Sequence, residues 1–365
     1  YAATNPDTAE ALAEFSDRVL RPYGPMLRKM TGSLARVAML QSVYSSLYGR
    51  TGNYGNANRI FADVYNSAIL AQLQPRILYE ESLGELEKFE VLLVPDTRFL
   101  SESGFAAVKR FLESGRTVIT DTGSRIPLAG IVKLPFEETA KLSAADREAA
   151  WRRGAKLLLK TLEDKKFQRL VSSPSDNLVI SRRLGDGDQA IFLINDSRTA
   201  GDYVGRFGKV LEAGVPQRAE VKFSPELTAQ GRVFYDVAAR RKVVLEKGGA
   251  AFFLPPGGGR LLYLASAELT GLKAKIAPTV RRGEKIRLRA ELLAAGPVKG
   301  TQALEVELRD SAGRRHVSSG YYCLTNGVFE LKIPIARNDR AGYWTVICTD
   351  LIAGHRAEAA FQVMP

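Results

Sequence analysis

The sequence is poor in the side chains that most often carry catalysis. Its 365 residues include two cysteines and two histidines, and all four lie near the C-terminal end: Cys323, Cys348, His316 and His355. A nucleophilic cysteine needs a base beside it, so a Cys-His pair is excluded from the part of the chain before residue 316. We predict no catalytic residue, no metal site and no cofactor.

Long apolar runs are also missing. No uninterrupted stretch approaches the ~20 residues that a transmembrane helix needs, so we predict no membrane span. The sequence begins at Tyr1 without a charged-then-apolar leader, so we expect any secretion signal to have been removed or to lie outside this sequence. The chain is therefore expected to be a fragment. For the whole protein we expect export to the periplasm, the medium or the cell surface, with a cytoplasmic location as the alternative.

The net charge of +12 is not gathered into a nucleic-acid-binding pattern. Residues 269–365 carry 15 Lys+Arg against 9 Asp+Glu, which is half of the excess. The densest cluster there is Arg281, Arg282, Lys285, Arg287 and Arg289. The last of these alternate with Ile286 and Leu288, as on the solvated face of a strand, and no stacking aromatics are interleaved. We predict no nucleic-acid partner.

What the sequence does contain is an alternation of strands and helices between residues 36 and 122. Strands are predicted over residues 36–42, 76–80, 89–94 and 117–122, and helices over 57–74 and 101–114. Such alternation is typical of a parallel sheet with helices on its faces. The run Val91–Val94 is apolar throughout, as in a strand buried on both faces. Ser101 is predicted to cap the helix that follows it.

A glycine-rich loop over residues 48–56 follows the first strand, where parallel sheets bind their ligands. Its spacing is neither Gly-x-Gly-x-x-Gly nor a Gly-Lys-Ser/Thr loop, so we predict that it binds no flavin or nucleotide. The alternative to a ligand-binding loop is a flexible loop that covers an interface. The residues assigned to an interface or ligand loop are Tyr44, Tyr48, Arg50, Asn53, Tyr54, Glu80 and Phe99.

Two tempting catalytic patterns are rejected. Glu80 and Glu81 would be neighbours on a strand and point to opposite faces, so they cannot flank one bond as glycosidase carboxylates do, although one of them could face the cleft. Ser124, after the fourth strand, has no Gly-x-Ser-x-Gly elbow and no base nearby in sequence.

The remaining residues divide the chain into four parts. Residues 1–33 are predicted as a lead-in, with a helix over 9–19 that Arg21–Pro25 breaks. Residues 34–169 form the α/β domain, with a long amphipathic helix over 144–167, and residues 170–268 form a β-sandwich with a hairpin around Asp186-Gly187. Residues 269–365 form an immunoglobulin-like sandwich of seven strands, predicted over 272–276, 285–293, 301–309, 314–320, 328–335, 343–349 and 357–363.

The two cysteines fall in this last part, on strands or strand ends. In an exported protein they could form a disulfide, whose closed loop would stabilise the fold by ~3 kcal/mol in the chain-entropy model. The alternative, two buried thiols, stays open.

Several segments resemble known modules. RPYGPML (21–27), FEVLLVPD (89–96) and FLESGRTV (111–118) resemble the amidotransferase-like trimerisation domain of family 42 β-galactosidases. RVFYDV (232–237) with FFLPPGG (252–258) is similar to β-sandwiches appended to such enzymes, and GYWTV (342–346) with FQV (361–363) is similar to macroglobulin-type surface modules.

The resemblance implies a flavodoxin/class I amidotransferase-like sheet that has lost its nucleophile, followed by two β-sandwiches. The family's catalytic glutamates belong to an upstream barrel, so none is carried over to this chain. The implied role is oligomerisation, as a trimer, and positioning of a carbohydrate. One rival interpretation is a flavodoxin-like receptor that binds a small molecule through residues 49–56. The other is a structural surface protein whose upstream part is not an enzyme.

Overall fold

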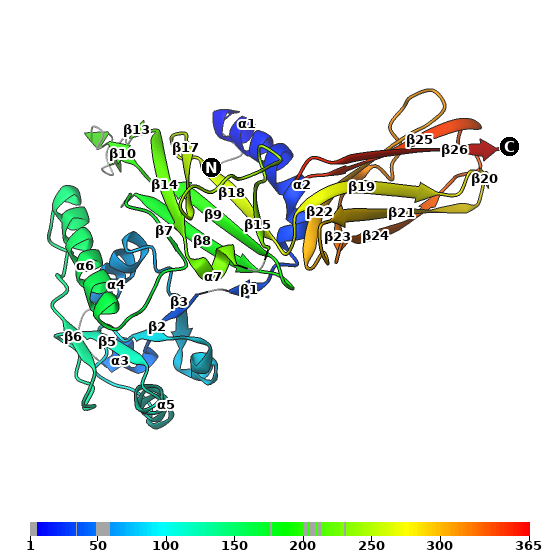
Figure 1. The fold of residues 1–365 in the computed structure, drawn as a ribbon. Helices are drawn as coiled ribbons and strands as arrows, with labels where there is room; N and C mark the ends of the chain where they lie inside the picture. The colour runs from blue at the N-terminus through cyan, green and yellow to red at the C-terminus, as the bar shows by residue number, and fades with distance from the viewer. Residues whose placement is uncertain are drawn as a thin grey trace.

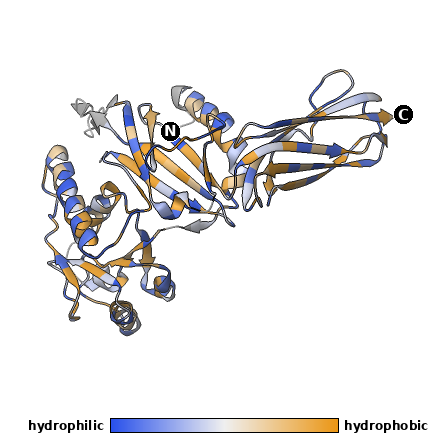
Figure 2. Ribbon diagram, in the orientation of Figure 1, coloured by the Kyte–Doolittle hydropathy of each residue, from blue (hydrophilic) through white to orange (hydrophobic). Residues whose placement is uncertain are grey.

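The computed structural model describes residues 6–33, 35–48, 59–175, 177–199, 203–204, 209–210, 213–229 and 231–365. Figure 1 shows an α/β domain at one end, a central β domain, and a second β domain at the C-terminal end. Hydrophobic residues line the strands of all three (Figure 2). No described helix is both long and apolar enough to span a bilayer.

The α/β domain contains the predicted parallel sheet. Its strands are β2 (Val37–Gln41), β3 (Arg76–Tyr79), β4 (Val91–Leu93), β5 (Thr117–Asp121) and β6 (Val132–Leu134). Their order is β3-β2-β4-β5-β6, and every pair is parallel. In chain order this is 2-1-3-4-5, the order of doubly wound sheets of the flavodoxin type.

Alternate side chains of this sheet enter two different cores. Met39 and Leu93 pack with α4 (Arg59–Leu70) and α6 (Ala144–Asp164), whereas Leu40 and Leu92 pack with α5 (Glu102–Glu113). The buried run after residue 90 is therefore central, as predicted, because both of its faces are covered. Ser101 caps α5, accepting from the Gly104 N–H at 3.0 Å.

Three elements of this domain were not predicted, and the first is the short helix α3 (Val43–Tyr48). The strand expected over 76–80 ends at Tyr79, and a 3-10 helix, η3 (Glu80–Lys88), packs on the same face as α5. Glu80 and Glu81 are therefore neighbours in a helix and not on a strand. The short edge strand β6 was also missed.

The central domain consists of two sheets around one core. One sheet has the order β1-β8-β9-β18-β15-β16 and the other β17-β14-β7. The hairpin around Asp186-Gly187 is confirmed, since β8 and β9 pair antiparallel on either side of it. The elements are β1 (Gly32–Ser33), β7 (Val171–Ser172), β8 (Leu178–Leu184), β9 (Gln189–Asn195), β14 (Gln217–Phe223), α7 (Pro225–Thr228), β15 (Val233–Asp236), β16 (Arg241–Lys242), β17 (Gly249–Leu254) and β18 (Gly259–Ala265). Short pairs are formed by β10 (Arg198–Thr199) with β13 (Ala213–Gly214) and by β11 (Tyr203–Val204) with β12 (Lys209–Val210).

The N-terminal segment packs on the β domains, and its predicted helix break is wrong. A π-helical turn, η2 (Ser16–Leu20), joins α1 (Pro6–Phe15) directly to α2 (Arg21–Leu27). Pro22 and Pro25 both lie within this helical stretch, which continues although each proline lacks the backbone N–H that a helix interior normally uses. Met26 and Met30 are fully buried in one cluster with the C-terminal domain, and β1 then pairs with β8.

The C-terminal domain has eight strands in the order β19-β21-β24-β23-β22-β25-β26-β20. They are β19 (Leu269–Ile276), β20 (Thr279–Arg281), β21 (Lys285–Ala294), β22 (Thr301–Arg309), β23 (Gly320–Thr325), β24 (Val328–Pro334), β25 (Gly342–Asp350) and β26 (Arg356–Met364). The strand predicted over 314–320 is wrong, because turns occupy this stretch. Asp310 accepts from the Ala312 and Arg314 N–H groups, and the Ser319 N–H then donates to the His316 carbonyl at 2.9 Å. Arg287 and Arg289 are exposed while Ile286 and Leu288 are buried, which confirms the solvated strand face.

A buried polar cluster joins the two β domains. Asp188 is fully buried, and its Oδ2 accepts from the Tyr263 hydroxyl at 2.8 Å and from the Thr301 N–H at 2.9 Å. Burial raises the pKa of the Asp188 carboxyl, although these two bonds oppose the rise. A Cβ at Gly300 (φ +83°) would lie 2.1 Å from the Asp188 Cγ, so only glycine allows this approach.

Candidate functional site

The carboxyl ends of the parallel strands form the edge at which a ligand or partner was predicted. β2 ends at Gln41 and leads through Ser42 into a short helix, α3 (Val43–Tyr48). Glu80 follows β3, and the loop after β4 carries Phe99 and Ser101 to the same edge. Topology therefore brings together three segments that are far apart in sequence.

Glu80 is held in a closed set of hydrogen bonds. Its Oε1 accepts from the Ser42 hydroxyl at 2.7 Å, and its Oε2 accepts from the Ser101 N–H at 2.8 Å and from the Ser101 hydroxyl. A Cβ at Gly104 would lie 2.6 Å from the Glu80 Oε2. Glycine at this position therefore lets the first turn of α5 approach the carboxylate closely. The carboxylate ties β2, β3 and α5 together, and both oxygens are occupied.

Ser45 fixes the neighbouring loop in the same way. Its hydroxyl donates to the Phe99 carbonyl at 2.6 Å and accepts from the Arg98 and Phe99 N–H groups at 3.0 and 2.9 Å. The inner face of α3 is thus hydrogen-bonded to the loop after β4. The sequence analysis missed Ser42 and Ser45, because nothing local marks a serine as a cross-loop donor.

The turn after β5 is closed by Asp121. Oδ1 accepts from the Ser124 hydroxyl at 2.5 Å and from the Asp96 N–H at 2.7 Å, while Oδ2 accepts from the Gly123 N–H at 2.8 Å. The Ser124 oxygen in turn accepts from the Thr97 N–H at 2.8 Å. Ser124 has an aspartate and a backbone amide beside it and no histidine, so the arrangement fits a turn and not a nucleophile.

The outer face of α3 is apolar and exposed. Leu47 and Tyr48 are 65% and 66% exposed, and Val43 and Tyr44 extend the same face at helical spacing. Phe99, on the loop bonded to Ser45, is 49% exposed. We call Val43, Tyr44, Leu47, Tyr48 and Phe99 the α3 surface. Large apolar side chains gathered in this way are typical of an interaction surface.

The structure brings four of the predicted residues to this edge: Tyr44, Tyr48, Glu80 and Phe99. Arg50, Asn53 and Tyr54, with most of the glycine-rich loop, lie outside the described residues. Val43 and Leu47 were missed, although their spacing with Tyr44 and Tyr48 was a readable signal. Among the described residues, no group of three His, Cys, Asp or Glu side chains could hold a metal ion.

The two cysteines lie on β23 and β25 as free thiols. Both strands pair with β22, on opposite sides of it, with Cys323 opposite Ala303 and Cys348 opposite Val306. Strands two positions apart are separated by ~9.5 Å, whereas a disulfide needs Cα atoms within ~7 Å. The geometry therefore favours the thiol alternative over the Cys323–Cys348 disulfide.

Comparison with known proteins gives likeness of fold only. No protein-family profile and no curated protein matches the sequence. A catalytic mutant of Gan42B, a GH42 β-galactosidase from G. stearothermophilus, is 13% identical (TM-score 0.44) over 71% of this chain and 44% of its own. An apo exo-carrageenase GH42 from Bacteroides ovatus is 13% identical (TM-score 0.36) over 63% and 29%. A mutant β-glucosidase from Listeria innocua is 12% identical (TM-score 0.24) over 99% and 50%. The chain spans less than half the length of the two GH42 structures.

Proposed function

We propose that this chain is a non-catalytic region of a larger glycoside-hydrolase-like protein, and that its α/β domain joins copies of that protein. The observation that carries the proposal is the α3 surface, where a six-residue helix turns four large apolar side chains outward. Aromatic side chains are enriched at the centres of protein interfaces. The partner that fits is a second copy of this chain, as in the trimers of the family that its segments resemble.

The chemistry of the edge supports a role without catalysis. Both oxygens of Glu80 and both of Asp121 accept hydrogen bonds from neighbouring loops. Carboxylates used in this way organise loops and leave no free general acid or base. The rest of the proposal, an upstream catalytic barrel, positioning of a carbohydrate and export of the whole protein, follows from the resemblance of the sequence.

Analytical ultracentrifugation tests the assembly role. We expect the wild-type chain to sediment as a trimer at micromolar concentration, and Leu47→Ala with Tyr48→Ala to sediment as a monomer. The matched control is Tyr343→Ala, an equally exposed aromatic on the C-terminal domain, which should leave the trimer intact. A wild-type chain that is a strict monomer contradicts self-assembly by this region alone.

The strand order favours one second candidate. Flavodoxin-type sheets bind flavin where the strand order reverses, and here that point lies between β2 and β4. A small-molecule receptor would use the loop over residues 49–56. We expect calorimetry to find no micromolar affinity for flavin mononucleotide or adenosine triphosphate, and a visible flavin spectrum in the purified protein would favour the receptor. The third candidate, a structural surface protein, is distinguished by the residues upstream of Tyr1, since a barrel with two strand-end glutamates argues for the enzyme.

A further inference from the structure

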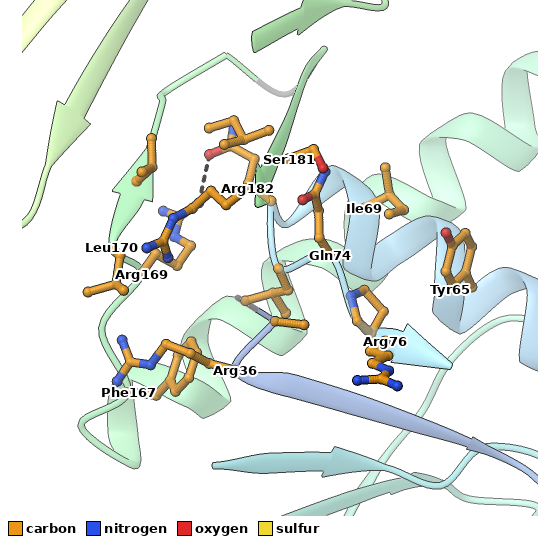
Figure 3. Close-up of a pocket in the computed structure, with 16 residues that line it drawn as sticks. Arg36, Tyr65, Ile69, Gln74, Arg76, Phe167, Arg169, Leu170, Ser181 and Arg182 are labelled. Carbon is orange, nitrogen blue, oxygen red and sulfur yellow. Dashed lines mark hydrogen bonds between the residues drawn. The ribbon is translucent and has the colours of Figure 1, made fainter. Parts of the chain in front are cut away.

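A cavity of about 320 Å³ lies where the α/β domain meets the central β domain. Four separate segments line it: residues 35–36 before β2, the run from α4 through the following turn to the start of β3, the stretch that follows α6, and β8. Each of these segments brings charged or amide side chains to the wall (Figure 3). The volume is at the lower end of the range for small-molecule pockets.

Four arginines surround this cavity, and two of them are neutralised. Arg36 forks onto Glu90, with Nη2 donating to Oε2 at 2.6 Å. Arg76 lies 3.0 Å from Glu85. Both carboxylates belong to the α/β domain and lie outside the cavity wall, and none of the described residues that line the cavity is an Asp or Glu.

The other two arginines, Arg169 and Arg182, have no carboxylate within salt-bridge distance in the described part of the chain. Arg169 donates to the Ala71 carbonyl at 3.2 Å and to Gln72 Oε1 at 3.0 Å, and both acceptors are neutral. Burial lowers the pKa of this guanidinium.

Arg182 is the more exceptional of the pair. Its Nη2 donates to Gln189 Oε1 at 2.8 Å, while its Nε is buried and has no hydrogen-bond partner among the residues that the structure describes. Burial lowers its pKa to about 10, with Glu226 opposing this effect from a distance and Arg36 adding to it. Arg182 thus combines a desolvated charge with an unmet donor, and both are expensive in a folded protein unless a ligand compensates them.

We propose that this cavity binds a small oxyanion, a carboxylate, sulfate or phosphate group, between Arg169 and Arg182. Guanidinium groups recognise such anions through paired hydrogen bonds. Tyr65, Ile69 and Phe167 form an apolar part of the wall that suits the body of an organic molecule carrying the anion. The site is separate from the α3 surface and does not depend on self-assembly.

Calorimetry of the whole chain at fixed ionic strength tests this proposal with three probes: sulfate, inorganic phosphate and glucuronate. We expect saturable binding of at least one of them, and tighter binding of glucuronate than of sulfate if the natural ligand is an organic acid. Arg182→Gln should weaken binding roughly tenfold or more, since a charge-assisted hydrogen bond and a charge are lost. Arg183→Gln is the matched control, because this neighbour on β8 is exposed and does not line the cavity.

Two results would overturn the site. One is the absence of saturable binding of all three probes to the wild-type chain, which needs no variant. The other is unchanged affinity in folded Arg182→Gln, as judged by circular dichroism. A weakening in Arg183→Gln equal to that in Arg182→Gln would also count against it, because it would indicate attraction by the general positive charge.

Discussion

The two junctions between the three domains are built differently. At the junction of the two β domains, Met26 of α2 and Met30 just after it are buried, and Asp188 is hydrogen-bonded across the junction to Thr301. At the junction of the α/β domain with the central domain there is a cavity lined by Arg169 and Arg182, neither of which has a carboxylate partner among the described residues. A junction packed with buried apolar side chains is stabilised by the hydrophobic effect, whereas a junction built around a polar cavity buries less apolar surface. We therefore expect the β domains to unfold together and the α/β domain to separate first.

The largest effect is expected from α2. Met26→Ala removes a fully buried side chain from the core shared with the C-terminal domain, and such a change lowers the free energy of unfolding by about 2 to 5 kcal/mol. Urea unfolding followed by Trp344 fluorescence in a Trp151→Phe background measures it. Leu20→Ala, at an exposed position of the same helical segment, should change it by less than about 0.5 kcal/mol. Equal effects of the two variants would show that α2 does not hold the junction.

The second effect concerns Asp188. Asp188→Ala leaves the Tyr263 hydroxyl and the Thr301 N–H without their acceptor, which costs about 1 to 3 kcal/mol. Asp188→Asn keeps an acceptor oxygen and removes the charge, so it should lower the free energy of unfolding far less than Asp188→Ala does.

The same carboxyl gives this junction a pH dependence. Its pKa is raised in the folded state, so its contribution to stability is fully present below the unfolded pKa and is lost as pH rises through the folded pKa. Compared with the wild type, Asp188→Asn should therefore gain relative stability in urea titrations as the pH rises above the ordinary pKa of an aspartate, about 4. Parallel stability curves for the two proteins would contradict this assignment.

Limited proteolysis compares the junctions directly. The domain boundaries near Leu170 and Leu269 stay predictions, but their surroundings differ. Residues 163–166 are exposed, whereas the Leu269 N–H donates to the Tyr235 hydroxyl oxygen at 2.8 Å. Subtilisin should cut between residues 163 and 168 several times faster than near Leu269, and a ligand in the arginine cavity should slow that cut. Equal cleavage within residues 59–122 would argue against the partition.

The smallest effect is expected at the cysteines, which lie within the C-terminal body. Burial raises the pKa of the Cys348 thiol to about 11, while Cys323 is half-buried. In the native protein a thiol reagent should therefore modify Cys323 first and Cys348 only slowly. Under denaturing, non-reducing conditions two free thiols are expected. Finding none would establish the disulfide and strengthen the expectation of export.

Local patterns predicted the elements whose partners are nearby in sequence. The apolar run after residue 90 identified the central strand, Ser101 identified the start of α5, and an Asp-Gly turn identified the β8–β9 hairpin. The patterns failed where distant packing decides. Pro22 and Pro25 suggested a broken helix, but burial of Met26 against the C-terminal domain favours a continuous one.

The candidate sites show the same division. Tyr44, Tyr48, Glu80 and Phe99 could be placed at one edge, because the carboxyl ends of parallel strands must meet there. The arginine cavity left no trace in the sequence, since Arg36, Arg76, Arg169 and Arg182 come from segments that only the tertiary fold brings together. That two of them have no carboxylate nearby in the described part of the chain likewise depends on the three-dimensional arrangement.

The course of the chain makes the α/β domain an insertion. The segment before it, α1 to β1, packs with the β domains, and the segment after it returns to them through β7. The segment that enters the α/β domain and the segment that leaves it lie side by side, because Arg36 Nη1 donates to the Gln168 carbonyl at 2.6 Å. A domain whose ends adjoin can be gained, lost or exchanged without disturbing its host. Residues 35–169 therefore form a unit that can be exchanged without the two β domains. A sequence alignment that assumes three consecutive domains would group residues 1–33 with the α/β domain, although they pack with the β domains.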